Sequence, residues 1–248
     1  MNHVALAPVD YASRARVGLI LPSINSVMEP EFLGVLPPGV TLHTTRIPYL
    51  GDDSDGVAKM NSETISAALL LKDVAPNVIV YGCTTGTMVE GAAWEAELKK
   101  SIEEATSIPT ITTSRSIVEA FEALGASKLA VFSPYGAVVN DDIARFLRAA
   151  GFEITNILSM HWRSPFRNLS EAEIETAAGK LDASGADGVF MACTGLKTIT
   201  FIDRLSATYR KPAVSSNTAT FWATLNHLDP PVSIGAMPGC ANLGPGRP

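Results

Sequence analysis

The sequence lacks several features that mark common functional classes. No uninterrupted apolar run reaches the ~18 residues that a membrane-spanning helix needs, and residues 1–13 lack the basic stretch and apolar core of a secretory signal. The 19 Lys and Arg residues form no cluster, and the net charge is −6. Nucleic acids and anionic membranes both require a basic face on the proteins that bind them. We therefore expect neither as a partner.

Cofactor and metal motifs are also missing. The chain contains neither a Gly-x-x-x-x-Gly-Lys-Ser/Thr phosphate loop nor a Gly-x-Gly-x-x-Gly dinucleotide fingerprint. Its four histidines are scattered without metal-ligand spacing, and its three cysteines form no Cys-x-x-Cys pair. We therefore expect no cofactor and no metal ion. Cysteines without a paired pattern are typical of free thiols in a reducing compartment, which favours the cytoplasm.

One stretch organises the rest of the chain. The apolar run 77–81 is followed by Gly82 and Cys83, then by hydroxyl residues and glycine, and a helical pattern covers residues 88–105. This order predicts a buried strand that delivers Cys83 to its carboxyl end, where a helix begins. The positive end of a helix dipole and unpaired backbone N–H groups favour the thiolate form of a cysteine placed there.

The same arrangement occurs a second time. The apolar run 187–192 leads into Cys193, Thr194 and Gly195, and we expect another helix after it. Two thiols in matched settings predict one site with a cysteine on each side. Cys240 lies outside both repeats, and we expect no role for it.

The whole chain shows this repetition. A chain of 248 residues with 46% hydrophobic and 18% charged residues can form one large domain or two lobes of roughly 110 residues each. The stretch 128–135 mirrors 16–23, and 212–219 mirrors 109–116. Strands are predicted at 16–21, 40–47, 108–111, 128–133 and 152–161, besides the runs before the two cysteines. Helices are predicted at 29–36, 55–74, 88–105, 114–124, 139–150, 170–183, with a Ser170–Glu173 capping box, and 218–227.

Strands that alternate with helices predict a parallel α/β sheet. We expect two pseudo-symmetric flavodoxin-like lobes, each with a mainly parallel four-stranded sheet flanked by helices. The N-terminal lobe is predicted to contain residues 15–113 plus about 213–228, and the C-terminal lobe residues 114–212. Residues 1–14 and 229–248 are expected to be flexible ends. Ligands bind outside the carboxyl ends of strands in such sheets, so Cys83 and Cys193 would face one another there.

Four further stretches resemble motifs of a known family. They are Pro22-Ser23-x-Asn25-x-x-x-Glu29, Ser133-Pro134-Tyr135, Asn168 just before the helix at Ser170, and Ser215-Ser216-Asn217-x-Ala219-x-x-Trp222. Together with the cysteine motifs, they resemble the aspartate/glutamate racemase superfamily over about residues 15–228. The most similar branch contains maleate cis–trans isomerases, arylmalonate decarboxylases and ectoine-utilisation racemase-like proteins. Members of this superfamily are often dimers, so the resemblance implies a homodimer.

The resemblance implies a cofactor-independent isomerase that acts on a small carboxylic acid. In maleate isomerisation, the Cys83 thiolate adds to the double bond, the resulting single bond rotates, and elimination gives fumarate. Cys193 exchanges a proton with the neighbouring carbon. Backbone N–H groups of Thr194 and Gly195 and the side chains of Thr84, Thr85 and Tyr135 would stabilise the enediolate, and Asn25 and Asn168 would hold the carboxylates.

Other functions remain open. The hydroxyl-rich Thr84–Thr87 stretch differs from the apolar one of the isomerases and is similar to the carboxylate-binding Thr-Ser pair of the decarboxylases, which lack the first cysteine. A decarboxylase would need only Cys193 as proton donor. An amino-acid or hydantoin-type racemase would use both thiols as acid and base, and a non-catalytic protein would only bind the carboxylate. Asn25 can also be a helix cap. Arg46, Arg163 and Arg167 are further candidates for carboxylate binding.

Overall fold

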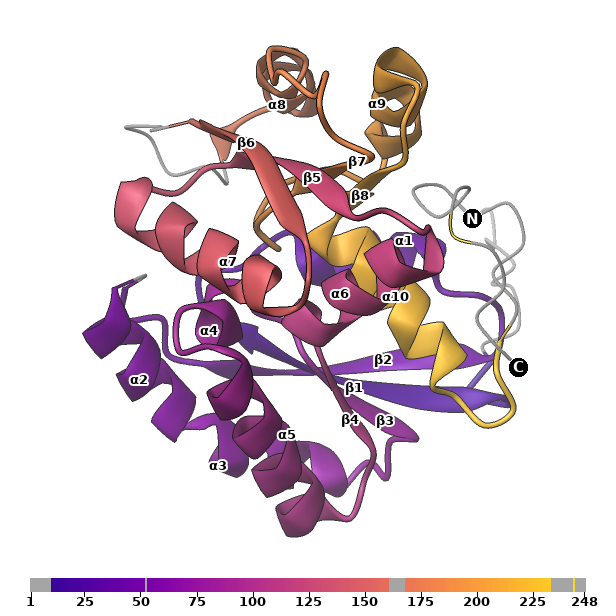
Figure 1. Cartoon of the computed structure of the whole chain (residues 1–248). Coiled ribbons are helices and arrows are strands. Elements are labelled where there is room, and N and C mark those ends of the chain that lie inside the picture. The colour runs from indigo at the N-terminus through magenta and orange to yellow at the C-terminus, as the bar shows by residue number, and fades with distance from the viewer. Residues whose placement is uncertain (1–9, 52, 161–167, 233–242, 244–248) are drawn as a thin grey trace.

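Two four-stranded parallel sheets form the frame of the protein (Figure 1). A computed structural model describes residues 10–51, 53–160, 168–232 and 243. The first sheet has the strand order β2-β1-β3-β4, and the second has the order β6-β5-β7-β8. The first set of strands is β1 Ala15–Pro22, β2 Val40–Ile47, β3 Val78–Tyr81 and β4 Thr110–Thr112. The second set is β5 Lys128–Ser133, β6 Glu153–Ser159, β7 Gly188–Met191 and β8 Ala213–Ser215.

The repetition predicted from the sequence is confirmed by this topology. β1 and β5 occupy equivalent places in their sheets, and so do β3 and β7, the strands that precede the two cysteines. All strand pairs are parallel. The predicted fold class of two α/β lobes with four-stranded parallel sheets is therefore correct.

The described residues contain ten helices. They are α1 Met28–Val35, α2 Ser54–Ser62, α3 Thr64–Lys72, α4 Thr85–Met88, α5 Ala92–Thr106, α6 Thr113–Ala123, α7 Ala137–Ala149, α8 Glu171–Ala178, α9 Ile202–Tyr209 and α10 Ser216–Asn226. The Ser170–Glu173 capping box is present at the start of α8, although this helix ends five residues before the predicted Ala183.

Two predicted helices differ from the structure at a local break. The helix expected over 55–74 is interrupted at Glu63, whose N–H bonds to the carbonyl of Met60, three residues back, instead of four. The helix expected over 88–105 begins only at Ala92, as α5, because Gly91 has a φ of 93° that no helix accommodates. The hydrophobic pattern alone does not reveal either break.

The helices α6 and α10 lie between the two sheets and pack against each other (Figure 1). Both contact β4 of the first sheet and β8 of the second. The Phe221 ring on α10 meets the Phe32 ring on α1 edge-on, with centroids 5.2 Å apart. One hydrophobic cluster contains residues of both sheets and Trp222 of α10. This shared layer fixes the carboxyl ends of β3 and β7 relative to each other.

The division into lobes remains a prediction. β8 belongs to the second sheet, so a return of the chain to the first lobe begins only after Ser215.

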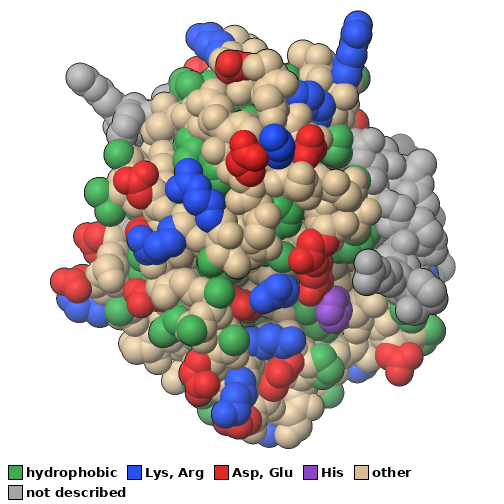
Figure 2. Space-filling view, viewed as in Figure 1, with side chains coloured by type: hydrophobic (Ala, Val, Ile, Leu, Met, Phe, Trp, Pro, Cys, Tyr) green, Lys and Arg blue, Asp and Glu red, His purple; other side chains and the backbone are tan. Residues whose placement is uncertain are grey.

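On the face drawn in Figure 2, acidic and basic side chains are interspersed. Among the described residues, no helix combines the length and the apolar character that crossing a bilayer requires.

Candidate functional site

Both cysteines stand two residues beyond the last residue of an equivalent strand. Cys83 follows β3 after Gly82, and Cys193 follows β7 after Ala192. Both are free thiols, with exposed fractions of 5% for Cys83 and 4% for Cys193. Their placement at the carboxyl ends of parallel strands agrees with the expectation from the sequence.

The sulfur of Cys83 lies at the start of the short helix α4. The Gly86 N–H donates a hydrogen bond to Sγ at 3.3 Å, and Oγ1 of Thr85 lies 3.7 Å from Sγ. A backbone N–H in the first turn of a helix stabilises an anion that accepts from it. This setting favours a thiolate at Cys83.

Cys193 has a different setting from the one predicted. No helix begins directly after it: Thr194 and Gly195 form a turn, and α9 starts only at Ile202. The Gly195 N–H donates to its Sγ at 3.3 Å, so this donor belongs to a turn and not to the first turn of a following helix. The backbone of Cys193 has a φ of 106°, a conformation that costs a non-glycine residue about 1–3 kcal/mol and that tends to occur at functional sites.

Hydrogen bonds join the two cysteine segments directly. Ser216, at the start of α10, accepts a hydrogen bond from the Cys193 backbone N–H at 3.1 Å and another from the Thr84 hydroxyl at 2.9 Å. The Thr194 hydroxyl also lies 3.4 Å from the Gly82 carbonyl oxygen, to which it donates. The residues next to each cysteine therefore contact the other cysteine's segment. Ser216 acts as the bridge, a role that its sequence motif did not reveal.

Asn25 belongs to the same network. Its Nδ2 donates to Oγ1 of Thr194 at 2.9 Å, and its Oδ1 accepts from the N–H groups of Val27 and Met28, both at 3.0 Å. Asn25 thus accepts from the backbone at the start of α1 and also reaches the Cys193 segment, while its role in holding a carboxylate stays a prediction. Its carbonyl accepts from Arg46 at 2.6 Å.

The remaining predicted residues are less closely tied to the cysteines. Arg46 forms an ion pair with Glu29 at 2.7 Å. Tyr135 is buried, and its carbonyl accepts from Ser159 at 2.6 Å. Asn168 is exposed; the carbonyl of the following residue accepts from Lys197, on the segment after Cys193, at 2.9 Å. The described residues do not include Arg163, Arg167 or Cys240, so the expectations for these three stay predictions.

Sequence reasoning missed a buried carboxylate that supports the Cys193 segment. Glu31 on α1 is 8% exposed and accepts from the N–H groups of Thr198 at 2.6 Å and Ile199 at 3.1 Å. Its other oxygen accepts from Nδ2 of Asn217 at 2.6 Å, which also donates to the Thr194 carbonyl at 3.2 Å. Burial raises the pKa of Glu31, while these three donors act in the opposite direction. A glutamate in the first turn of a helix is ordinarily solvated, so the sequence carries no signal for this role.

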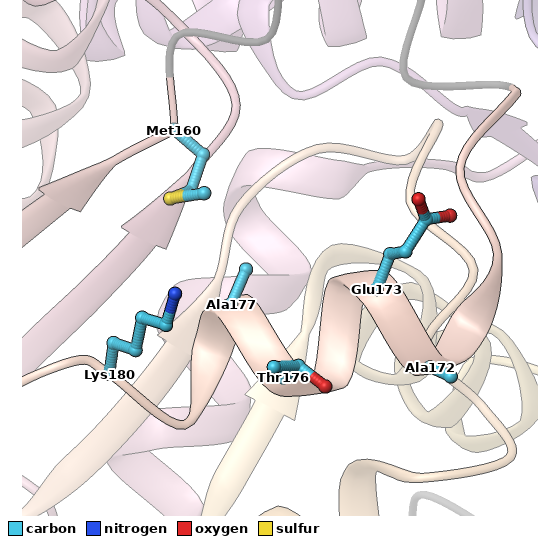
Figure 3. A pocket seen from close by; sticks show the side chains of 6 residues that line it. All are labelled: Met160, Ala172, Glu173, Thr176, Ala177 and Lys180. Atoms are coloured by element: carbon cyan, nitrogen blue, oxygen red, sulfur yellow. The ribbon is translucent and has the colours of Figure 1, made fainter.

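A surface hollow of about 390 Å³ lies beside α8 (Figure 3). Its lining residues are Met160, Ala172, Glu173, Thr176, Ala177 and Lys180. None of them is a predicted site residue, so the hollow does not bear on the two cysteines. No group of three or more His, Cys, Asp or Glu side chains suited to a metal ion occurs among the described residues.

The chain is similar to proteins named for two activities, maleate isomerisation and arylmalonate decarboxylation. A family model described as arylmalonate decarboxylase matches residues 17–237. A maleate isomerase of Pseudomonas putida is 28% identical over 235 residues, covering 86% of this chain and 92% of that protein. The structure of Nocardia farcinica maleate cis–trans isomerase bound to TRIS has a TM-score of 0.83 and 25% identity, covering 91% and 95% of the two chains. Another structure of the Nocardia enzyme, a mutant with a covalently bound succinylcysteine intermediate, has a TM-score of 0.81 and 24% identity over 88% and 94%.

Proposed function

The chain belongs to the arylmalonate decarboxylase family, and within it we propose that the chain is a cofactor-independent isomerase that converts maleate to fumarate. The observation that carries the proposal is the pair of cysteines at equivalent strand ends, joined through Ser216. A decarboxylase needs one proton donor, whereas addition and elimination across a double bond need a nucleophile and an acid/base. The similarity to a maleate isomerase over 92% of that protein's length supports the same reaction.

The proposed reaction begins at Cys83. Its thiolate forms a bond to one alkene carbon of maleate, and the π electrons move to the other carbon and its carboxylate as an enediolate. The Cys193 thiol donates its proton to that carbon, which leaves a succinyl thioether on Cys83 and a thiolate on Cys193. The central bond is now single and rotates. Cys193 then removes a proton, the carbon–sulfur bond breaks, and fumarate leaves with the Cys83 thiolate restored.

The enediolate requires fixed hydrogen-bond donors, since no cofactor supplies an electron sink. We assign this role to the hydroxyls of Thr84, Thr85 and Tyr135 and to the backbone N–H groups of Thr194 and Gly195. Thr84, Thr85 and Thr194 are buried next to the cysteines in the chain, which supports the assignment because hydrogen bonds to an anion strengthen away from water. The Thr84 hydroxyl donates to Ser216 in the structure, so it has to rotate to donate to the enediolate. The amides of Asn25 and Asn168 are proposed to hold the two carboxylates. We further propose a homodimer that acts in the cytoplasm.

Decarboxylation of a substituted malonate is the second candidate. The family model carries that activity in its description, and two adjacent hydroxyls at Thr84 and Thr85 suit a carboxylate that is about to leave as carbon dioxide. In this reaction Cys193 alone protonates the enediolate, and Cys83 has no chemical task.

Proton NMR of the purified protein with maleate tests the proposal. We expect the vinyl signal of maleate to be replaced by that of fumarate, while phenylmalonate in a parallel sample stays intact. A double variant, Cys83→Ser with Cys193→Ser, prepared in the same way, controls for contaminating host enzymes. Carbon dioxide release from phenylmalonate with unchanged maleate would instead select the decarboxylase.

A further inference from the structure

The two cysteines have equivalent positions but different neighbours. The residue two positions before Cys83 is Tyr81, and the residue two positions before Cys193 is Met191. These residues end β3 and β7, pair with equivalent strands at Ile20 and Phe132, and are both fully buried. A phenol carries a hydrogen-bond donor, whereas a thioether has no hydrogen to donate. The pseudo-symmetry is therefore broken by one polar group beside Cys83.

A chain of hydrogen bonds leads from this phenol to the Cys83 sulfur. The Tyr81 hydroxyl donates a short hydrogen bond to Oδ1 of Asn61, a buried residue of α2. Nδ2 of Asn61 donates to the Gly86 carbonyl at 2.8 Å. The N–H of Gly86 in turn donates to Sγ of Cys83. Both the oxygen and the nitrogen of the Asn61 amide are thus hydrogen-bonded. Asn61 therefore holds Gly86 in place, and the Gly86 N–H donates to the sulfur.

The phenol also lies directly against Gly86. A Cβ atom added to Gly86 would overlap the Tyr81 hydroxyl, so the close approach requires glycine there. Burial raises the pKa of Tyr81 well above its ordinary value of 10.0, and the charge of Cys83 and a hydrogen bond to it raise this pKa further. The phenol therefore stays protonated at neutral pH and keeps its hydrogen bond to Asn61.

We propose that Tyr81 and Asn61 are positioning residues that fix the Gly86 N–H against the Cys83 sulfur and so favour its thiolate. Cys193 accepts from the equivalent Gly195 N–H at 3.3 Å, but Met191 stands there in the place of Tyr81. Hydrogen bonds to the charged form of a group stabilise that form, so a donor that is held in place favours the Cys83 thiolate. This inference rests on the proposed function and deepens it, because the Cys83 thiolate is the group that attacks the substrate.

Single-thiol proteins test this inference without any substrate. Because the chain has 3 cysteines, the pair Cys193→Ser with Cys240→Ser leaves Cys83 alone, and Cys83→Ser with Cys240→Ser leaves Cys193 alone. The rate of alkylation by iodoacetamide, followed by intact mass against pH, reports the thiolate fraction. Tyr81→Phe should move the midpoint of the Cys83 profile upward by about one pH unit and leave the Cys193 profile unchanged.

Asn61→Ala in the same two backgrounds provides a second variant, and we expect an upward shift of the Cys83 profile alone. Thermal melts confirm that each protein is folded. An unshifted Cys83 profile in both variants, or equal shifts at the two thiols, would overturn the positioning role. A selective shift in a protein that leaves maleate unchanged would support this inference while contradicting the proposed isomerase. Maleate turnover together with an unshifted Cys83 profile would support the isomerase and contradict the positioning role.

Discussion

Cys83→Ser is expected to lower the kcat for maleate isomerisation by at least about a thousandfold. The reason is chemical: a serine hydroxyl is far less acidic than a thiol, so at neutral pH the variant has no anionic nucleophile to add to the double bond. Residue 83 should tolerate the smaller oxygen, because the backbone N–H of Gly86 and the hydroxyl of Thr85 beside the sulfur can also hydrogen-bond to an oxygen. Steady-state assays of fumarate formation measure the effect.

Two comparisons make the Cys83 result specific. Cys240→Ser removes a thiol outside both repeats, and we expect wild-type turnover from it. Cys193→Ser should also abolish turnover, since the acid/base is lost. A decarboxylase would behave differently, because it requires Cys193 but not Cys83. Maleate turnover by Cys83→Ser within tenfold of wild type, roughly 1.4 kcal/mol in barrier height, would eliminate the nucleophile assignment.

Glu31→Ala is expected to lower the free energy of unfolding by about 3 kcal/mol or more. The substitution removes the acceptor of three donors: the buried N–H of Thr198, the part-buried N–H of Ile199 and the buried Nδ2 of Asn217. Unpaired buried donors cost free energy, and the segment that they fix follows Cys193 directly. We therefore expect kcat to fall as well. Urea unfolding followed by circular dichroism measures the stability.

Glu31→Gln is the matched control for this prediction. The amide oxygen still accepts from the Thr198 and Ile199 N–H groups. Asn217 can rotate its amide so that Oδ1, which is buried without a hydrogen-bond partner among the described residues, accepts from the new NH₂ group. This rotation gives up the hydrogen bond from Nδ2 to the Thr194 carbonyl. The cost should therefore be roughly half that of Glu31→Ala. Equal unfolding free energies for wild type and both variants, within about 0.5 kcal/mol, would show that the carboxylate does not support this segment.

The stability contribution of Glu31 should also depend on pH. Burial raises its pKa in the folded protein above the ordinary value of 4.5. Between the two pKa values the folded state retains a proton that the unfolded state releases, so the stability decreases as the pH rises. Relative to Glu31→Gln, the wild type should be most stable below pH 4.5 and lose this advantage as the pH passes through the raised pKa.

The sequence alone was sufficient to predict the two equivalent sheets and the position of Cys83 and Cys193 at strand ends. Apolar runs ending in Cys83 and Cys193 predict strands, and the repeated order predicts two equivalent sheets, because these properties depend on local residues. The interaction of Glu31 with Thr198 joins residues 167 positions apart, and a helical glutamate looks the same whether solvent or protein covers it. The bridge at Ser216 and the Tyr81–Asn61 pair were missed for the same reason. The turn after Cys193 was missed because Thr194 and Gly195 also suit a helix start.

The most direct test of a thiolate nucleophile at Cys83 is mass spectrometry of the Cys193→Ser variant after incubation with maleate. Without the Cys193 acid/base, the adduct should form slowly with a solvent proton and then persist, because nothing removes the proton that elimination requires. We expect the protein mass to rise by one maleic acid, with the added group on the tryptic peptide that contains Cys83. An unmodified Cys83 peptide, in a variant whose wild-type parent converts maleate to fumarate, would contradict covalent catalysis by this cysteine.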